Sequence, residues 1–392
     1  MPLLLVLGLA SFAGALSVRI VDPVVPAIAR DLATTAASAA LLASAFSFPY
    51  AFAQPVLGPL GDAVGKALII KAGLALLAIT LAVSAAAPTI EMLFAARILG
   101  GLAAGGIIPL AFAMVGDRFV MAERQFALSR ILTAALTGQL VGAVGSGLVA
   151  SYLGWRTVMA LACVVTLGAL AITLRSLNVR PERISKLTIA GMRAGYGRVF
   201  QNPNAAVCYA AVFIEAVSLF GLLPYVATLL EQKGAGGVRE AGFVIAGMGI
   251  GGLLFTFSVR AMLLRLRGQT NLIRAGGLVA AVGLVLVAAA PTWPAEMAAF
   301  VVIGCGFYML HNSLQTQATE LAPDNRGAAV ALHAFFFFLG QAAGPIVFAL
   351  GLATVGAAPS ILIAALTMAL LGFAVASALK RITARQSQRP AE

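Results

Sequence analysis

The chain has 392 residues, of which 61% are hydrophobic and 10% are charged, and its formal net charge is +12. Soluble globular proteins average roughly half apolar and about a quarter charged residues, so a mean hydropathy of +1.00 excludes an ordinary soluble domain. The composition predicts an integral membrane protein. The basic excess then reports how the chain is oriented in the bilayer, and a nucleic-acid partner is not expected.

Apolar segments of roughly 20 residues recur along the whole chain, and this is the length that an α-helix needs to cross ~30 Å of hydrocarbon. The segments are apolar on every face and lack the alternation of barrel strands, so we expect helices. The expected spans are 3–23, 36–57, 67–87, 90–114, 130–152, 156–176, 205–230, 238–259, 272–290, 295–319, 326–352 and 356–379. The predicted fold class is an all-α integral membrane protein with twelve transmembrane helices.

The basic residues predict the orientation of these spans. Connections that follow odd-numbered spans hold only four of the 26 lysines and arginines, namely Arg30, Arg156, Lys233 and Arg239. By the positive-inside rule, the more basic alternate connections face the cytoplasm, which places both termini inside. We expect a monomeric, multi-pass protein of the cell membrane, and the Ala, Gly and Arg usage favours a bacterial inner membrane.

A basic stretch divides the chain into two similar halves. The predicted linker is 177–204, between a first six-helix bundle at 1–176 and a second at 205–380, with a cytoplasmic tail at 381–392. Sliding the second half by 202 positions aligns Arg124 with Arg326, Ala127 with Ala329, Gly138 with Gly340, Gln139 with Gln341 and Gly142 with Gly344. Two pseudo-symmetric bundles related by an axis along the membrane normal predict an alternating-access transporter.

The loop after the second span reads GPLGDAVGK, from Gly58 to Lys66. It resembles the signature loop of the major facilitator superfamily, whose positions fall here on Gly58, Asp62, Gly65 and Lys66. The resemblance implies that Gly58 lets helices approach closely and that Asp62 lies against the positive end of the eleventh helix, as a latch that forms and breaks. Basic residues are usual at two further positions of the loop, which are alanines here, Ala63 and Ala67.

Three other stretches resemble motifs of the same superfamily. FAARILGGLAAGG carries Arg97 in the fourth span, and LAPDNRGAAVAL resembles the turn into the eleventh helix. GQLVGAVGSG, which contains Gly138 and Gly142, is similar to a fifth-helix motif associated with antiporters, although Ala143 stands where Pro is usual. The resemblance covers nearly the whole chain, implies the major facilitator fold and suggests the drug/proton antiporter branch.

Ionisable residues occur inside several spans, where a charge costs ~3 kcal/mol on insertion scales. They are Arg19 and Asp22 in the first span, Arg97 in the fourth and Glu215 in the seventh. In the family's architecture, the first, fourth, seventh and tenth helices line the central cavity, so these residues are candidates for proton coupling. Glu215 is the leading candidate, and its alternative role is a static helix tie. Asp22 could pair with Arg97 or cap the end of its span, and Arg19 could extend outward to the interface.

Two polar stripes predict contacts with a solute. Tyr308, His311, Asn312 and Gln315 recur at helical spacing in the tenth span, and Tyr50 and Gln54 form a shorter stripe in the second. Aromatic, amide and imidazole groups suit a solute with polar groups on an apolar body. Hydrogen bonding between helices is the alternative. His333, in the eleventh span, is interpreted as structural.

Signals of a soluble enzyme are missing, because the Gly-rich runs lack a Walker lysine and the two histidines and three cysteines form no metal motif. We therefore expect no enzymatic activity, no metal and no cofactor other than a proton gradient. The predicted function is secondary active transport of a small organic solute, with proton-coupled export of amphipathic compounds as the first hypothesis. Import of a nutrient or metabolite by symport or uniport is the alternative, and a non-transporting sensor, assembly factor or intramembrane enzyme is a third class.

Overall fold

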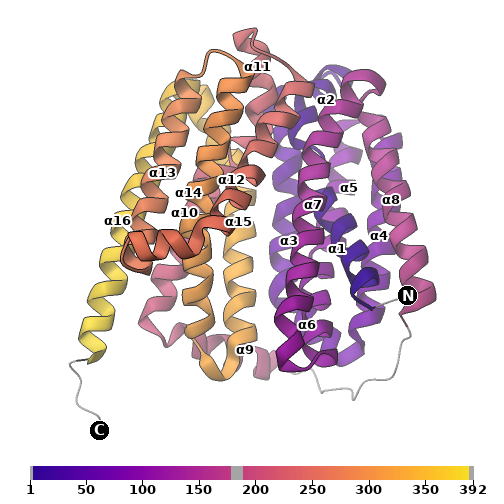
Figure 1. The fold of residues 1–392 in the computed structure, drawn as a ribbon. Helices are drawn as coiled ribbons and strands as arrows, with labels where there is room; N and C mark the ends of the chain where they lie inside the picture. Colours follow the sequence, from indigo (N-terminus) through magenta and orange to yellow (C-terminus); the bar gives the residue numbers. More distant parts are fainter. Residues whose placement is uncertain (1–2, 178–188, 388–392) are drawn as a thin grey trace. The chain divides into compact units, whose positions relative to one another are not determined.

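The computed structural model describes residues 3–177 and 189–387. Within these ranges every regular element is a helix, and 12 helical spans are long and apolar enough to cross a membrane (Figure 1). The prediction of an all-α, twelve-span membrane protein is confirmed. The predicted linker falls partly outside the described residues, and its described part forms a short helix, α9, Ile189–Phe200.

The helices follow the chain in this order. The first half forms α1 Leu3–Arg19, η1 Asp22–Val24, α2 Val25–Asp31, α3 Ala36–Val64, α4 Lys66–Ala86, α5 Ile90–Ala104, α6 Ile107–Arg118, α7 Met121–Leu153 and α8 Trp155–Ser176. After α9, the second half forms α10 Pro203–Phe220, η2 Leu223–Tyr225, α11 Val226–Lys233, α12 Val238–Arg265, α13 Gln269–Ala289, α14 Trp293–Glu320, η3 Pro323–Asn325, α15 Arg326–Thr354 and α16 Ala357–Ser387.

Spans one, four and seven are each interrupted, so that two helices share one crossing. The breaks fall at Pro23, at the pair Gly105 and Gly106, and at Pro224. Proline lacks an amide donor and glycine weakens a helix, which explains why the hydrogen-bonded ladder stops at these positions. The helices then resume, so the predicted ends of the first and seventh spans fall short of the observed ends at Asp31 and Lys233.

The contacts divide the chain into two compact units. Unit 1 contains residues 1–192 and 223–243, and unit 2 contains residues 193–222 and 244–392. The segment 223–243, which holds η2, α11 and the start of α12, thus groups with the first half of the chain. The predicted bundle boundaries at 176 and 205 stay a prediction.

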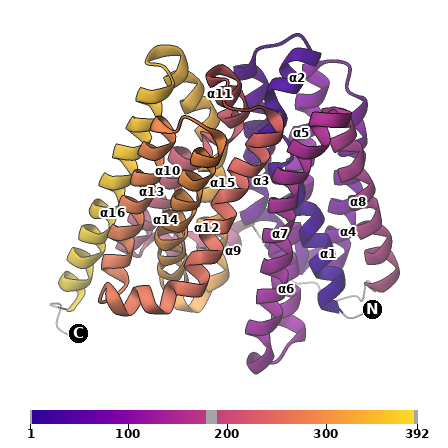
Figure 2. The same cartoon turned by 45° about the horizontal axis from the view of Figure 1, so that its top comes forward.

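Glycines allow close helix packing in unit 1, where α1 and α7 lie side by side (Figures 1 and 2). A Cβ added at Gly138 would lie 2.4 Å from the backbone oxygen of Phe12, and one added at Gly142 would lie 2.6 Å from that of Leu16. A side chain at either position would overlap the backbone of α1. The glycines of the antiporter-like motif are therefore required for helix packing.

Unit 2 repeats this packing between α10 and α15. A Cβ at Gly340 would lie 2.4 Å from the oxygen of Phe213, and one at Gly344 would lie 2.8 Å from the Cα of Gly221. Gly340 and Gly344 are the positions that the 202-residue offset aligns with Gly138 and Gly142. The internal repeat in the sequence is thus matched by equivalent helix contacts in the two units.

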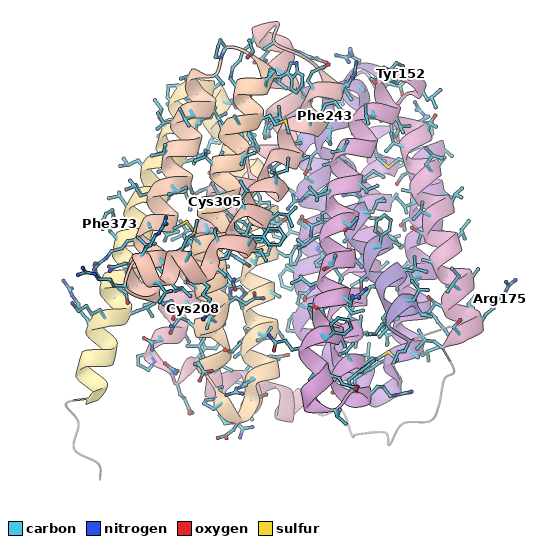
Figure 3. All side chains as sticks on the ribbon, viewed as in Figure 1. Tyr152, Arg175, Cys208, Phe243, Cys305 and Phe373 are labelled. Carbon is cyan, nitrogen blue, oxygen red and sulfur yellow. The ribbon has the colours of Figure 1, made fainter. Side chains whose placement is uncertain are left out.

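Large apolar side chains project outward from the helices (Figure 3). Phe257 of α12 is 87% exposed and Phe373 of α16 is 51% exposed. Such residues would be a liability in water, whereas hydrocarbon chains solvate them without cost. The exposed apolar faces agree with a chain that is surrounded by lipid.

Candidate functional site

Glu215 is a fully buried ionisable group of unit 2. It lies in the second half of α10 with 0% exposure, and neither of its carboxyl oxygens has a hydrogen-bond partner among the described residues. Its nearest polar neighbour is His311 of α14, whose Nδ1 lies 3.5 Å from Oε1 of Glu215. The carboxyl group therefore has one potential proton acceptor, slightly beyond ordinary hydrogen-bond length.

Aromatic rings surround this pair. The imidazole of His311 stacks on Phe307 with 4.8 Å between ring centroids, and Phe337 of α15 lies 4.6 Å away. Phe220, at the end of α10, contacts both phenylalanine rings edge to face. An apolar wall of this kind excludes water and strengthens any electrostatic interaction inside it.

His333, which the sequence analysis interpreted as structural, lies in contact with this cluster. It lies on α15 with 2% exposure, and its ring centroid is 5.1 Å from that of His311. The available signal in the sequence was that the chain has only two histidines, both inside predicted spans. Helix periodicity could not show that the two faces meet, because they belong to different helices.

The predicted stripe of the tenth span, now α14, divides between two environments. Its four residues spread over roughly 100° of the helix circumference. His311 lies at one edge against α10 and α15, whereas Tyr308 lies about 60° around the helix from it, over Gly252 of α12. Asn312 and Gln315 are exposed. Of this stripe, Asn312 and Gln315 are thus the residues that keep accessible polar groups.

Arg97 occupies a different environment in unit 1. It is 3% exposed on α5, and it donates hydrogen bonds to the backbone oxygens of Ser17, at 3.0 Å, and Leu42, at 3.4 Å. Its guanidinium also lies 4.1 Å from the centre of the Phe46 ring. These contacts tie α5 to α1 and α3.

Asp22 forms an ion pair with Arg19, at 3.3 Å, whereas the two alternatives from the sequence were a pair with Arg97 and a cap at the end of the span. Asp22 is 0% exposed and Arg19 is 8% exposed, so Arg19 does not extend outward. Arg19 and Asp22 are three residues apart, a spacing that places two side chains on the same face of a helical turn, so the pair forms within its own segment.

Gln54 and Tyr50 contact a broken helix. The side-chain amide of Gln54 donates to the backbone oxygen of Gly105 at 2.8 Å, which satisfies a carbonyl at the interruption between α5 and α6. A Cβ at Gly105 would lie 2.9 Å from the backbone oxygen of Tyr50, whose side chain is 2% exposed. Gln54 thus makes the interhelical hydrogen bond that was the alternative to solute binding, and the role of Tyr50 stays a prediction.

The signature loop forms a small charge cluster. Nζ of Lys66 lies 2.7 Å from carboxyl oxygens of both Asp62 and Asp117, so the lysine joins the start of α4 to the ends of α3 and α6. Gly65 has φ = 103°, which favours glycine at this turn. The predicted contact between Asp62 and the start of α15 stays a prediction.

The close approach expected at Gly58 occurs instead at Gly61. A Cβ at Gly58 would meet nothing within 4 Å among the described residues, whereas one at Gly61 would lie 2.4 Å from Cδ2 of Leu110. The helix phase explains the shift, because Gly61 lies on the face of α3 that contacts α6.

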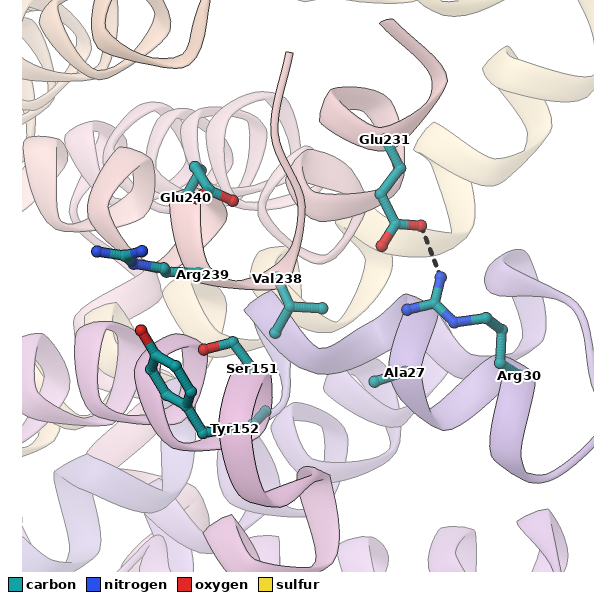
Figure 4. A pocket seen from close by; sticks show the side chains of 9 residues that line it. Ala27, Arg30, Ser151, Tyr152, Glu231, Val238, Arg239 and Glu240 are labelled. Atoms are coloured by element: carbon teal, nitrogen blue, oxygen red, sulfur yellow. Dashed lines mark hydrogen bonds and ion pairs between the residues drawn. The ribbon is translucent and has the colours of Figure 1, made fainter. Parts of the chain in front are cut away.

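A polar pocket of about 430 Å³ lies in unit 1, where α2, α7, α11 and α12 come together (Figure 4). At its edge, Arg30 forms an ion pair with Glu231 at 2.8 Å. Ser151, Arg239 and Glu240 contribute further polar groups. In the described part of the chain, no group of three or more His, Cys, Asp or Glu residues is arranged to hold a metal ion.

Twelve apolar spans, two glycine-packed helix pairs and interrupted helices with buried ionisable groups define a multi-pass membrane transporter. The sequence profile of the Major Facilitator Superfamily matches residues 7–345, and the chain belongs to this family. It is therefore a multi-pass protein of the cell membrane and not an enzyme.

Several characterised proteins are similar to this chain over most of its length. It is 25% identical over 341 residues to Multidrug resistance protein 1 of Bacillus subtilis (strain 168), covering 86% of each chain. It is 26% identical to the quinolone resistance protein NorA of Staphylococcus aureus (strain COL), covering 85% of each. These relatives agree with a drug/proton antiporter-like branch. The crystal structure of the nucleoside transporter NupG shares the fold, with a TM-score of 0.79 and 17% identity over 97% of this chain and 100% of that one.

Proposed function

We propose that this transporter exports small amphipathic compounds in exchange for protons, and that Glu215 carries the exchanged proton. The observation that carries the proposal is the environment of Glu215, a fully buried carboxyl group whose oxygens meet no hydrogen-bond donor within the described part of the chain. The similarity to two drug-resistance proteins along most of the chain supports the choice of solute class.

The surroundings of Glu215 suit a group that alternates between two protonation states. A bare carboxylate is costly in an apolar site, so the closed aromatic environment favours the neutral acid. Water that enters during the transport cycle, or a proton on His311, would stabilise the carboxylate and release its proton. A static tie between helices would instead engage the carboxyl oxygens in hydrogen bonds.

The solute contacts in this proposal come from accessible polar groups beside apolar rings. Asn312 and Gln315 are exposed on α14, one to two turns along the helix from Phe307 and Tyr308. An amide donor and acceptor next to aromatic surface suits a compound with a polar group on an apolar body.

Import of a metabolite is the second candidate. It is favoured by Ala143, 2% exposed, which stands where the antiporter-like motif usually has proline, and by the polar side chains of Asn312 and Gln315. Uptake of labelled solutes into proteoliposomes with an imposed pH gradient separates the two candidates by the direction of movement.

The decisive variant is Glu215→Gln, which keeps the size of the side chain and makes it permanently uncharged. We expect transport driven by a pH gradient to fall to background, while solute binding and solute-for-solute exchange survive in part. Glu296→Gln is the matched control, because Glu296 is also a buried glutamate of unit 2, 1% exposed in the first turn of α14. Full pH-driven transport by a well-folded Glu215→Gln protein would refute the proton role.

A further inference from the structure

The two histidines of the chain form a cluster with Glu215, and they lie on the successive long helices α14 and α15. His311 of α14 faces the carboxyl group, with Nδ1 3.5 Å from Oε1, and His333 of α15 lies next to His311, with 5.1 Å between the ring centroids. His311 is thus in contact with both Glu215 of α10 and His333 of α15. All three belong to unit 2.

These three groups share an uncommon property. Both oxygens of Glu215, Nδ1 of His311 and Nε2 of His333 are buried without a hydrogen-bond partner among the described residues. Buried polar atoms are normally paired, and an unpaired one costs about 1–3 kcal/mol. Packing alone does not account for four such atoms in one place, whereas a path for a proton requires open acceptor positions.

Other titratable groups near the cluster are already engaged. Cys208 donates to the backbone oxygen of Leu314 at 3.3 Å, and the hydroxyl of Tyr209 donates to that of Ala329 at 3.0 Å. Helix α16 packs against α10 and α15 and has no titratable side chain between Ala357 and Leu379. On α14, Cys305 and Tyr308 face the apolar cluster around Phe255. His311 and His333 thus remain as the proton acceptors for Glu215 within the described part of the unit.

We infer that His311 and His333 form a two-step proton relay for Glu215, an inference that rests on the proposed proton-coupled function. In the first step, the proton leaves the carboxyl group of Glu215 for Nδ1 of His311, which produces a carboxylate and an imidazolium. In the second step, the imidazolium gives up its other ring proton to His333. One proton has then moved from α10 to α15, and His311 is neutral again with its proton on the opposite nitrogen.

The relay has a mechanical consequence. After the first step, the opposite charges of Glu215 and His311 attract each other across 3.5 Å, which holds α10 against α14. After the second step, the positive charge lies on α15 and this attraction weakens with distance. The position of one proton thus changes which helices attract each other, as a coupled transporter requires.

Nuclear magnetic resonance of the full-length protein, labelled with ¹⁵N-histidine and purified without a histidine tag, tests the relay directly. Two imidazoles give two sets of signals, which report protonation and tautomer for each ring. We expect both rings to change over the same pH interval with two-step curves, because proton-exchanging neighbours titrate as a unit. A His333 signal that stays in one neutral tautomer between about pH 5 and 9 while His311 titrates would overturn the relay.

Variants add an independent test. In His333→Gln, the midpoint of the His311 titration is expected to move by about one pH unit, since groups in a relay interact at least this strongly. Leu332→Ala is the control, because it loosens the packing of the neighbouring buried residue of α15 and keeps both imidazoles. An unchanged His311 midpoint in a folded His333→Gln protein would also refute the relay.

Failure of the relay can be told apart from failure of the proposed function. If Glu215→Gln abolishes pH-driven transport while the histidine signals are uncoupled, the proton role of Glu215 stands and the relay is wrong. If Glu215→Gln transports normally, the proposed function itself is wrong, whatever the histidines do.

Discussion

The two units of the chain share a pattern of close helix packing at glycine, but they differ in the hydrogen bonds that a buried ionisable residue makes. Gly138 in unit 1 and Gly340 in unit 2 each bring a helix against a backbone oxygen, at 2.4 Å from an added Cβ. In unit 1, however, Arg97 is bonded to two backbone oxygens and covers an aromatic ring, whereas neither oxygen of Glu215 in unit 2 has a hydrogen bond to a residue that the structure describes. The two units thus share a pattern of helix packing and differ in how a buried ionisable residue is bonded.

The largest effect is expected from the shared scaffold. Gly138→Leu places a side chain into the backbone of α1, and we expect a loss of more than about 4 kcal/mol, enough to prevent a stable fold. Gly145→Ala is the control on the same helix, because the added Cβ meets only Val141 Cγ1 at 3.8 Å. Thermal unfolding and the monodisperse fraction in detergent measure both variants. A well-folded Gly138→Leu protein would show that α1 and α7 can separate without loss.

The second prediction tests the difference between the two charges. Arg97→Leu removes the donor from two buried carbonyl groups and should cost about 3 kcal/mol, whereas Glu215→Leu removes an unpaired polar group and should cost less than about 1 kcal/mol or stabilise the fold. The melting temperatures of the two purified variants give the comparison. Equal losses of stability in the two variants would mean that Glu215 is hydrogen-bonded in the folded protein. The contrast between Arg97 and Glu215 would then be wrong.

A smaller effect is expected at the signature loop. Lys66→Met breaks the ion pairs with Asp62 and Asp117, whose side chains are 53% and 47% exposed. Solvent screens such pairs, so we expect a loss of about 1 kcal/mol in the free energy of unfolding. Lys71→Met, further along α4, is the control. A loss of several kcal/mol at Lys66 alone would indicate that the loop is a core element of unit 1.

The smallest effect is expected at the pocket of unit 1. A double-mutant cycle that exchanges the charges of Arg30 and Glu231 should give a coupling of about 0.5 kcal/mol, because the two side chains are 63% and 31% exposed. The coupling should shrink as ionic strength rises. Persistence of the coupling at high salt would show that the pair is less hydrated than its exposure indicates.

Part of the site could be predicted from the sequence, and part could not. Glu215 and His311 were found because a charged residue or an imidazole inside an apolar span is unusual, whichever direction its side chain takes. For Gln54 the sequence left solute contact and interhelical hydrogen bonding open, because its partner is a backbone carbonyl at the helix break of Gly105. The pairing of Asp22 with Arg19 was not predicted, although the two residues are only three positions apart.

By itself, the sequence determined that this protein spans a membrane twelve times and repeats its helix pairs. Hydrophobic length and glycine spacing are properties of a single helix, so the order of residues within one segment is enough to show them. Only the tertiary structure decided that His333 joins Glu215 and His311, that Arg97 is bonded to carbonyl groups and that Gly61 is the packing glycine of its loop. Each of these depends on the rotation of one helix against another. That rotation is set by side-chain packing across the interface, and no periodicity within either helix contains it.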